Sequence, residues 1–593
     1  MKPISPAVEH PFSPGSEGLP APAANRCTTG ISRLEGLLAA AIFIVFLGLR
    51  GCYIYSHSWN SDETQHLHVV WGWVNGLLQY RDVFDNHTPL FQLLSAPLFA
   101  LFGERADIVE LMRAAMIPLF ILSLWCVYKI GRQLFSTRIG LWAAVLASFF
   151  PRWAIKMGEY RTDVFWTTLW LVTLVILVSG RLTPKRLFCA GLVLGATFAV
   201  SMKSTLLLIT LLAAGILTWA ATRRWSTAPA RPLREVLSGG FLALLGLLLI
   251  PSAIVGYYAA KGALGSLYYC VIAHNTLPGT SSLPYIAKHV FSWQSLSIFP
   301  GLALASMALP QSRWKIPYLP ARLFLLLVVA LFYPVLHGLW PMVTPQDFLP
   351  ITPLYALLIA GAGILGGEQL RQRRYPALAP YSIVLILTLV ELGLMIKMEH
   401  PFEHSNRGQI GLISDVLRLT KPGEFVMDAK GESVYRPRPY YYVLEKLTNK
   451  RLGLHLIVDD LPQRLVDTRT AVLVPTTRMT SESKVFVAKN YLPVSKLSVL
   501  GQIAKETAPG VPTGFDVVIP ARYTLVSESG KLTGTLGGEP FHEPVELQAG
   551  HYEFVRESGE GRVALVWARA VELGYSPFHR YKTPKSEAWS SGK

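Results

Sequence analysis

The sequence contains little charge and few cysteines. Asp, Glu, Lys and Arg make up 16% of its 593 residues, against roughly 25% in ordinary globular domains, whereas 51% of the residues are hydrophobic. None of the five cysteines, Cys27, Cys52, Cys126, Cys189 and Cys270, belongs to a CxxC pair, which argues against a disulfide framework and a cysteine metal site. The chain after Cys270 has no cysteine, so we expect its C-terminal part to fold without disulfides.

Several catalytic motifs are absent as well. The sequence has no Gly-rich loop ending in Lys-Ser/Thr, no HExxH and no DxD-type metal motif. Soluble nucleotide chemistry and zinc proteolysis therefore have little support. We expect a reaction without cofactor or metal; a divalent cation is compatible with the sequence but not indicated by it.

Long apolar runs dominate the first two thirds of the chain. Several are shorter than the roughly 20 residues of a straight span, but together they predict a mainly α-helical, polytopic membrane bundle of about eleven spans. The runs are Leu34–Tyr53, Ala114–Ile130, Ile139–Phe150, Val164–Ser179, Leu187–Ser201, Leu206–Ala221, Leu237–Tyr257, Phe291–Leu309, Leu323–Trp340, Ile351–Leu365 and Ile383–Ile396.

The net charge of +17 is concentrated in short loops between these runs, which indicates membrane topology and not nucleic-acid binding. Alternate loops hold clusters such as Lys129, Arg132 and Arg138. By the positive-inside rule, the N-terminus lies in the cytoplasm, and everything after Lys397 lies outside.

Composition divides the chain into segments. We expect a disordered, Pro-rich cytoplasmic tail (residues 1–30), a membrane domain (31–397) whose first outer loop (56–113) holds amphipathic interfacial helices, an α/β domain (398–510), a small β-sandwich-like module (511–575) and a flexible tail (576–593).

An acidic pair, Asp62 and Glu63, follows the first apolar run on the outer face. Carboxylates are costly in hydrocarbon, so a pair at a membrane boundary indicates a function. Asn60 and Glu63, however, also match a capping box at a helix N-terminus, in which case Glu63 is structural.

Four motifs resemble those of the GT-C glycosyltransferases. Asp62-Glu63 resembles the acidic signature after the first span, Asp85-Asn86-His87-Thr88-Pro89-Leu90 the Lys-Pro-Pro-Leu-type motif, Phe102-Gly103-Glu104 the Leu-Phe-Gly motif, and Arg161-Thr162-Asp163 the second acidic site. The branch most similar to this chain contains bacterial relatives of protein O-mannosyltransferases and of the aminoarabinose transferase that modifies lipid A. His87 stands where the aminoarabinose branch commonly has lysine. The resemblance extends from Trp59 to Lys203, more weakly to Pro350, and not into the tail.

This resemblance implies a periplasmic active site in the bacterial inner membrane. A hexosyl or pentosyl group would move from a polyprenyl-phosphate donor to a hydroxyl or phosphate of a glycan, lipid or protein acceptor, by inverting direct displacement. The leaving phosphate needs positive charge, and an acceptor hydroxyl needs a base. The expected residues are Asp62, Glu63 and Asp163 for catalysis, Arg161, Lys203 and His87 for the donor phosphate, and His274, Lys288, His337 and Asp347 for acceptor or donor contacts.

Simpler roles exist for some of these residues. Asp163 also suits the N-terminal end of a helix because of the helix dipole, and Arg161 and Lys203 suit lipid headgroups. In the tail, the charged loop Asp428–Glu432 could grip a glycan, but we expect a solvated turn.

Two other classes of function are alternatives to the enzyme. A transporter or lipid flippase would place polar residues near the bilayer midplane, often within repeats. Here the polar residues cluster at the outer face and no repeat is evident, which favours the transferase. A structural assembly subunit is the third alternative.

Overall fold

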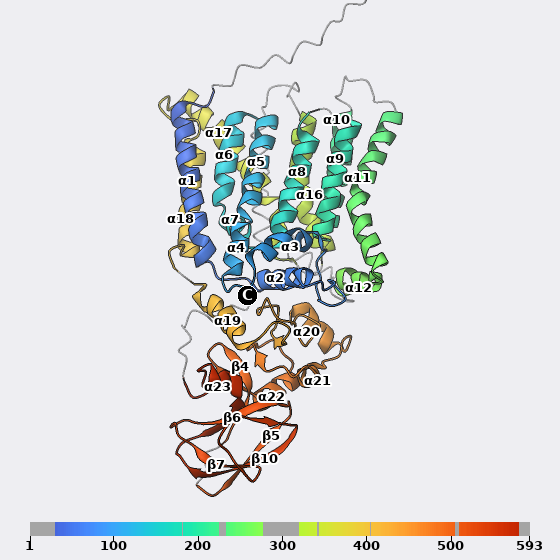
Figure 1. The fold of residues 1–593 in the computed structure, drawn as a ribbon. Helices are drawn as coiled ribbons and strands as arrows, with labels where there is room; N and C mark the ends of the chain where they lie inside the picture. The colour runs from blue at the N-terminus through green and yellow to red at the C-terminus, as the bar shows by residue number, and fades with distance from the viewer. Residues whose placement is uncertain are drawn as a thin grey trace, which may run out of the picture.

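The computed structural model describes residues 30–180, 182–223, 233–276, 319–340, 343–403, 405–504 and 509–579. A bundle of long helices forms the upper part in Figure 1, and a unit of sheets and short helices forms the lower part. The predicted tail at residues 1–30 and the run Phe291–Leu309 lie mostly or wholly outside the described residues.

Each of the other predicted apolar runs coincides with a helix of the bundle, so the predicted mainly helical architecture is confirmed. Six helices in the described part of the chain are long and apolar enough to cross a membrane. The bundle helices are α1 (Arg33–Ser56), α5 (Ile117–Leu134), α6 (Thr137–Phe149), α8 (Thr162–Val178), α9 (Pro184–Val200), α10 (Ser204–Arg223), α11 (Leu233–Ala260), α16 (Leu319–Leu339), α17 (Thr352–Arg373) and α18 (Ser382–Glu399).

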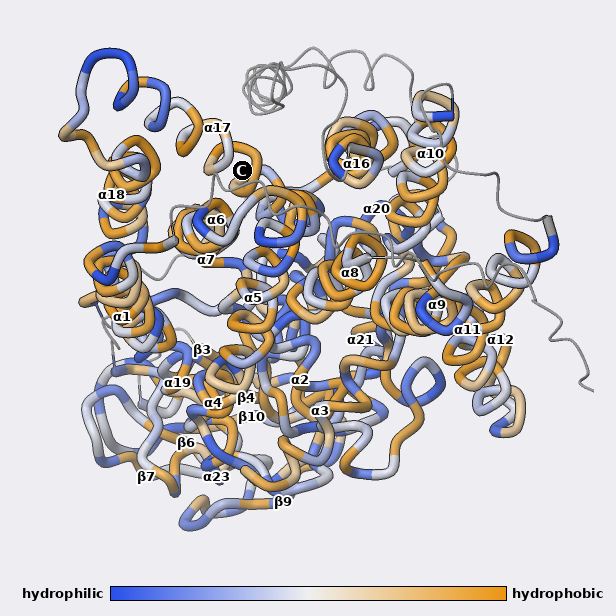
Figure 2. The backbone as a smooth tube through the Cα atoms, turned by 90° about the horizontal axis from the view of Figure 1, so that it is seen from above, coloured by the Kyte–Doolittle hydropathy of each residue, from blue (hydrophilic) through white to orange (hydrophobic). Residues whose placement is uncertain are grey.

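Glycines allow two of these helices to pack closely. A Cβ atom added at Gly191 of α9 would lie 2.0 Å from the carbonyl oxygen of Ala243 in α11, and one added at Gly246 of α11 would lie 2.3 Å from the carbonyl oxygen of Phe188. Small residues let helix backbones approach within membranes, where dispersion contacts drive association. Seen from above in Figure 2, α9 and α11 lie side by side at the edge of the bundle opposite α1 and α18.

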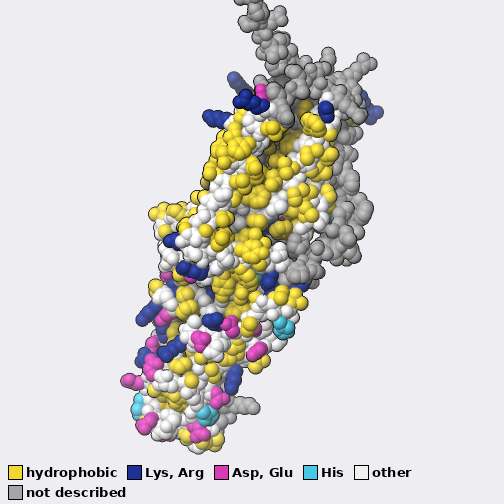
Figure 3. Space-filling view, turned by 90° about the vertical axis from the view of Figure 1, so that its right-hand side faces the viewer, with side chains coloured by type: hydrophobic (Ala, Val, Ile, Leu, Met, Phe, Trp, Pro, Cys, Tyr) yellow, Lys and Arg dark blue, Asp and Glu magenta, His cyan; other side chains and the backbone are white. Residues whose placement is uncertain are grey.

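The surface of the bundle is that of a multi-span membrane protein. Large apolar side chains such as Leu237, Phe241 and Leu248 of α11 are exposed. In Figure 3 hydrophobic side chains cover the helical part, and Lys and Arg side chains gather at its upper end, away from the lower unit.

Short helices close the lower end of the bundle. They are α2 (Ser61–Val74), α3 (Leu90–Phe102), α4 (Ile108–Ala114), α7 (Pro151–Lys156), α12 (Leu264–Tyr268), the π-helix η1 (Tyr269–Ala273) and the 3₁₀-helix η2 (Pro345–Phe348). Figure 1 shows α2 lying across the bundle end. Every residue of α2 from Glu63 to Gly72 is buried, because the bundle covers one side of the helix and the lower unit covers the other.

The described residues of the lower unit form two sheets. The larger has the strand order β1-β2-β4-β11-β6-β9 with β3 on β4, and the smaller has the order β5-β10-β7-β8. Pairing is antiparallel except between β1 and β2. The elements are α19 (Arg407–Leu419), β1 (Val426–Met427), α20 (Lys446–Gly453), α21 (Leu461–Asp467), β2 (Val472–Leu473), α22 (Ser481–Asn490), β3 (Tyr491–Val494), β4 (Leu497–Ile503), β5 (Pro512–Val517), β6 (Ala521–Ser527), β7 (Thr533–Leu536), β8 (Glu539–Pro540), β9 (Val545–Leu547), β10 (Gly550–Ser558), β11 (Val563–Trp567) and α23 (Ala568–Glu572).

The larger sheet contains strands from both sides of residue 510, the predicted boundary between the α/β domain and the strand-rich module. Strand β4 pairs with β11, so that Gln502 lies opposite Leu565. Val499 of β4 and Ala564 of β11 are fully buried in one shared hydrophobic core. The α/β part and the strand-rich part are therefore joined by continuous backbone hydrogen bonding.

Candidate active site

The first corner of the site is the N-terminus of α2. The Asn60 side chain accepts a hydrogen bond from the Asp62 backbone N–H (3.0 Å), and Glu63 Oε2 accepts one from the Asn60 backbone N–H (2.8 Å). The structure thus confirms the capping box that the sequence indicated. The side chains of Asp62 and Glu63 point in different directions, although the two residues are neighbours in the chain.

Glu63 is turned into the protein interior. Its carboxylate is fully buried and accepts hydrogen bonds from Arg113 Nε (2.7 Å), Arg113 Nη2 (2.6 Å) and the Tyr160 backbone N–H (2.8 Å). A bidentate arginine pair of this kind holds both partners in fixed orientation. Glu63 therefore braces α2 against α4 and against the chain entering α8.

Asp62 faces the second corner, at the start of α8. Arg161 Nη2 lies 2.7 Å from Asp62 Oδ2 and 3.0 Å from Asp163 Oδ2. Arg161 Nη1 lies 3.4 Å from Glu159 Oε2. The two acidic motifs, about a hundred residues apart in the chain, thus meet on a single guanidinium group.

A second cation continues the chain of charges. Lys203, between α9 and α10, lies with its Nζ atom 3.4 Å from Asp163 Oδ1 and 2.5 Å from Asp347 Oδ1. Asp347 is 1% exposed, and its other oxygen caps η2 by accepting from the backbone N–H (2.6 Å) and hydroxyl (2.8 Å) of Thr344. Three predicted site residues are therefore in direct contact here.

The lower unit contributes a third cation, which the sequence analysis missed. The Lys430 ammonium group donates to Asp62 Oδ1 and lies 3.2 Å from Glu445 Oε2. The expectation of a solvated turn at Asp428–Glu432 was wrong, because Asp428, Lys430 and Glu432 are 0%, 7% and 6% exposed. The one available signal was the density of charges close to three consecutive tyrosines, Tyr440–Tyr442.

These residues form one network of alternating charges, which we call the charged centre. Its members are Asp62, Glu159, Arg161, Asp163, Lys203, Asp347, Lys430 and Glu445. Burial alone would raise the pKa of Asp62, but the charges of Arg161 and Lys430 outweigh it and hold this pKa well below its usual range. Burial alone would lower the pKa of Lys430, whereas Asp62 and Glu445 raise it above its ordinary value. Both groups are therefore charged at neutral pH.

A buried polar cluster adjoins the charged centre. The Asp85 carboxylate, 0% exposed, accepts hydrogen bonds from Gln79 Nε2 (2.8 Å), Gln92 Nε2 (3.1 Å) and His87 Nδ1 (2.8 Å). Burial would lower the pKa of His87, but the adjacent Asp85 raises it above 6.5. Burial and the neighbouring His87 lower the pKa of His66 well below 6.5. Of the two rings, His87 is therefore the one that more readily carries a positive charge, and His66 is neutral.

Three side chains of this cluster could hold a metal ion. His66, Asp85 and His87 each offer a ligand atom, and these atoms lie within 4.8 Å of one another. The Gln92 amide nitrogen, however, already joins Asp85 Oδ2 to His66 Nδ1 (3.2 Å). Hydrogen bonds within the protein engage both oxygens of the Asp85 carboxylate, whereas His66 Nε2 is buried without a hydrogen-bond partner among the described residues.

Two of the remaining predicted contacts, His274 and His337, pack among aromatic rings. His274, fully buried at the end of η1, packs between Phe84 (ring centroids 4.9 Å apart) and Tyr442 (6.1 Å). Burial, followed by the charge of Arg451, lowers the pKa of His274 to about 4. His337 packs against Phe348, next to Asp347, with centroids 5.9 Å apart. Lys288 lies outside the described residues.

The chain is similar in sequence to a known protein family and in structure to solved proteins. Residues 86–250 match the family described as dolichyl-phosphate-mannose-protein mannosyltransferase. No curated protein sequence matches the chain. ArnT from Cupriavidus metallidurans in the apo state is similar in structure, with a TM-score of 0.55 and 13% sequence identity over 79% of this chain and 98% of that one. The chain has the GT-C glycosyltransferase fold.

Further structures of GT-C proteins are similar to this chain. ArnT from Cupriavidus metallidurans bound to undecaprenyl phosphate aligns with a TM-score of 0.54 and 13% identity, over 78% of this chain and 98% of that one. The Archaeoglobus fulgidus oligosaccharyltransferase in the apo form has a TM-score of 0.47 and 10% identity, over 78% of this chain and 74% of that one. The resemblance found in the four motifs is confirmed at the level of the GT-C fold.

Proposed function

We propose that this GT-C chain is a membrane glycosyltransferase that moves a sugar from a polyprenyl-phosphate donor to an acceptor hydroxyl or phosphate. One observation carries the proposal: Asp62 and Asp163 share Arg161 at the end of an apolar helical bundle. We expect the lipid chain of the donor to lie beside the apolar helices and its phosphate to lie at their end, near the cations Arg161 and Lys203. The undecaprenyl phosphate bound by the similar ArnT supports a donor of this class.

The chemistry assigns separate tasks to acids and cations. The acceptor oxygen attacks the anomeric carbon while the bond from that carbon to the phosphate oxygen breaks, and the phosphate leaves with the electron pair. Attack from the opposite face inverts the configuration. For a hydroxyl acceptor, Asp62 takes the proton, because of the two acids that share Arg161 it is the more accessible, with 20% of its side chain exposed against 6% for Asp163. Arg161, Lys203 and His87 stabilise the negative charge of the leaving phosphate.

The other acids have supporting tasks. Asp163 orients Arg161 and Lys203, since it contacts both cations. Glu63 holds the α2 corner through Arg113 and does not contact the substrate. Three fixed cations supply the positive charge that this transfer needs, so we propose a reaction without metal or other cofactor. His274, His337, Asp347 and Lys288 remain proposed contacts for donor or acceptor.

We further propose that the charged centre faces the periplasm of a bacterium, with the N-terminus in the cytoplasm. The lower unit and the charged centre are at the same end of the bundle, and the first residues of α1 are at the other end. Lys and Arg side chains gather at that other end in Figure 3, and Arg138 of one basic loop pairs there with Glu35 in the first turn of α1, as expected of a cytoplasmic face.

The test follows product release by the purified chain. The protein and its Asp62→Asn variant are supplied with polyprenyl-phosphate sugars, and free polyprenyl phosphate is measured. We expect Asp62→Asn to slow turnover by about 100-fold or more, in the range for loss of a general base. Asp107→Asn is the matched control, because Asp107 lies on the same outer segment, 41% exposed, and pairs only with Arg105 among the described residues. Equal turnover by the unmodified chain and Asp62→Asn contradicts the role of Asp62.

A further inference from the structure

A loop of the lower unit inserts a lysine into the charged centre. We call residues Asp428–Val434 the Lys430 loop. The Asp428 carboxylate organises it by accepting hydrogen bonds from the backbone N–H groups of Gly431 (2.7 Å) and Ser433 (2.8 Å) and from the Ser433 hydroxyl (2.6 Å). Arg438 Nε donates to the same carboxylate at 2.8 Å. The backbone that carries Lys430 is therefore tied down within the loop.

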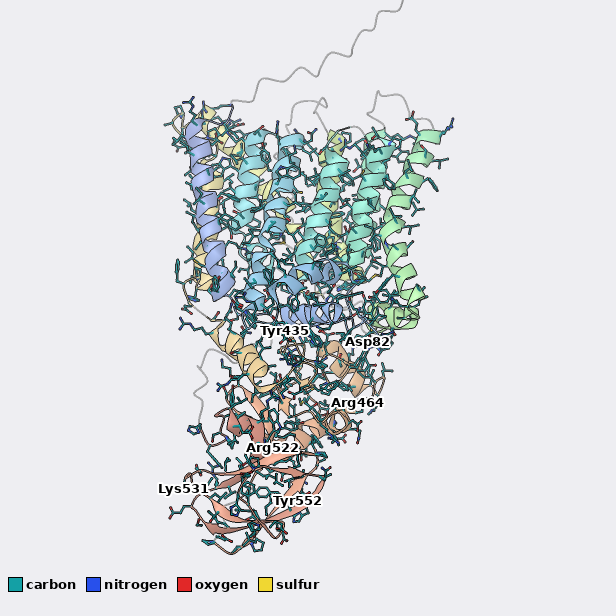
Figure 4. The ribbon with its side chains drawn as sticks, viewed as in Figure 1. Asp82, Tyr435, Arg464, Arg522, Lys531 and Tyr552 are labelled. Carbon is teal, nitrogen blue, oxygen red and sulfur yellow. The ribbon has the colours of Figure 1, made fainter. Side chains whose placement is uncertain are left out.

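The Lys430 loop fits closely against α2. Gly431 has φ +79°, and a Cβ atom added there would lie 2.8 Å from His68 Cβ and 3.0 Å from the Thr64 carbonyl oxygen. His68 Nδ1 donates to the carbonyl oxygen of Val434 at 3.0 Å. Next to this junction, Tyr435, labelled in Figure 4, accepts a hydrogen bond from the Arg105 backbone N–H at 3.1 Å. These contacts seat the lower unit on the bundle and direct Lys430 to the first turn of α2.

In this arrangement Asp62 is a weak base. Lys430 occupies its Oδ1 atom, and Arg161 occupies its Oδ2 atom at 2.7 Å. The two cations keep the pKa of Asp62 well below its usual range, which favours the ionised form and opposes proton uptake from a hydroxyl. For Asp62 to act as a base, one of the two cations has to leave it.

Lys430 is the cation that leaves more easily. Arg161 is held by two further carboxylates, Asp163 and Glu159, and its guanidinium group is planar and rigid. Among the described residues the Lys430 ammonium group has one other acidic partner, Glu445, and it ends a flexible four-carbon stem. The loop can therefore remain seated while only the end of the lysine side chain moves.

We propose that Lys430 binds the phosphate of the lipid-linked donor, and that this change of partner frees Asp62 to accept a proton. The inference rests on the proposed function and deepens it, because it adds a donor-binding residue from the lower unit. The donor phosphate and Asp62 compete for one ammonium group. Binding of the donor is thereby linked to activation of the base, and an empty site keeps its base blocked.

The test measures binding of undecaprenyl phosphate to the purified full chain in lipid nanodiscs. Lys430→Met is expected to weaken this binding about tenfold, as loss of a charge-assisted contact does, and Lys430→Arg to restore most of it. Lys450→Met is the matched control, since Lys450 is exposed on the same unit and undergoes the same change of charge. Size-exclusion elution of each variant monitors its folding.

A second variant is expected to bind undecaprenyl phosphate more tightly, not more weakly. Asp62→Asn removes the competitor for Lys430, so it is expected to tighten undecaprenyl phosphate binding about tenfold. In the Asp62→Asn/Lys430→Met double variant this gain should fall below about threefold, because only the general loss of a negative charge remains. A misfolded variant would not bind more tightly, so the gain reports on competition.

The outcomes separate the two proposals. If the unmodified chain does not bind undecaprenyl phosphate, the proposed function and this inference both fail. If the unmodified chain binds it and Lys430→Met binds equally well, only the role of Lys430 is overturned. The same conclusion follows if Asp62→Asn gives equal gains with and without Lys430.

Discussion

A single added methyl group at Gly431 is predicted to unseat Lys430 without altering any charge. Gly431→Ala places a Cβ atom 2.8 Å from His68 Cβ, 3.0 Å from the Thr64 carbonyl oxygen and 3.2 Å from Gln65 Cα. All three atoms belong to α2, two of them to its backbone, and none is the end of a flexible side chain. Either α2 or the Lys430 loop has to move.

The matched control is Gly423→Ala in the same unit. Gly423 also has a left-handed backbone, with φ +86°, but no atom lies within 4 Å of its added Cβ. Both substitutions therefore impose the left-handed strain of an L-residue, about 1–2 kcal/mol. Only Gly431→Ala adds a steric clash. If the clash costs the docked loop about 2 kcal/mol, the ratio of docked to undocked loop falls about 30-fold relative to the control.

The assay compares undecaprenyl phosphate binding, sugar-transfer turnover and thermal unfolding in the two variants. We expect Gly431→Ala to reduce binding and turnover at least about fivefold, and Gly423→Ala to leave both within about twofold while lowering the unfolding temperature. Indistinguishable binding and turnover in the two glycine variants would refute the argument that the seated loop matters.

Three further predictions follow from buried charges. Glu63→Gln should destabilise the chain by about 3–5 kcal/mol, measured by thermal unfolding, because it leaves Arg113 buried without its counter-ion; a mild loss would contradict the bracing role. Asp85 raises the pKa of His87, so the positive charge of His87, and with it the affinity for the donor phosphate, should be lost as pH rises through a value above 6.5. Asp85→Asn should move this loss to lower pH when donor binding is measured against pH. An unshifted binding profile would exclude a role for the Asp85–His87 pair. Burial, with Asp428 nearby, raises the pKa of Glu432 to about 7, so the folded chain binds a proton that the unfolded chain releases near 4.5. Stability should therefore fall between about pH 4.5 and 7, and Glu432→Gln should remove that slope in pH-dependent unfolding; an unchanged slope would assign it elsewhere.

The sequence predicted the helical bundle well because each membrane span depends on the composition of one short, continuous stretch of residues. A run such as Leu34–Tyr53 must be apolar to lie in lipid, so its composition alone identifies α1. The sequence also predicted the N-terminal turn of α2, since a capping box requires only Asn60 and Glu63 three residues apart. The motifs at Asp62 and Arg161 identified the two corners of the site.

The lower unit was harder to interpret. Lys430 belongs to a loop whose composition is that of an ordinary solvated turn, and only docking against α2 buries it. The pairing of β4 with β11 joins segments about sixty residues apart, which alternation of residue types does not reveal.

The sequence by itself determined that this chain is a helical membrane protein with acids and cations at one end, because hydrophobicity and charge are properties of single residues and short runs. Tertiary structure alone decided which charges meet. It joined Asp62 to Arg161 from a distant helix and to Lys430 from the lower unit, and it turned Glu63 away. Ion pairs depend on distances of a few ångströms, and packing of the whole chain sets those distances.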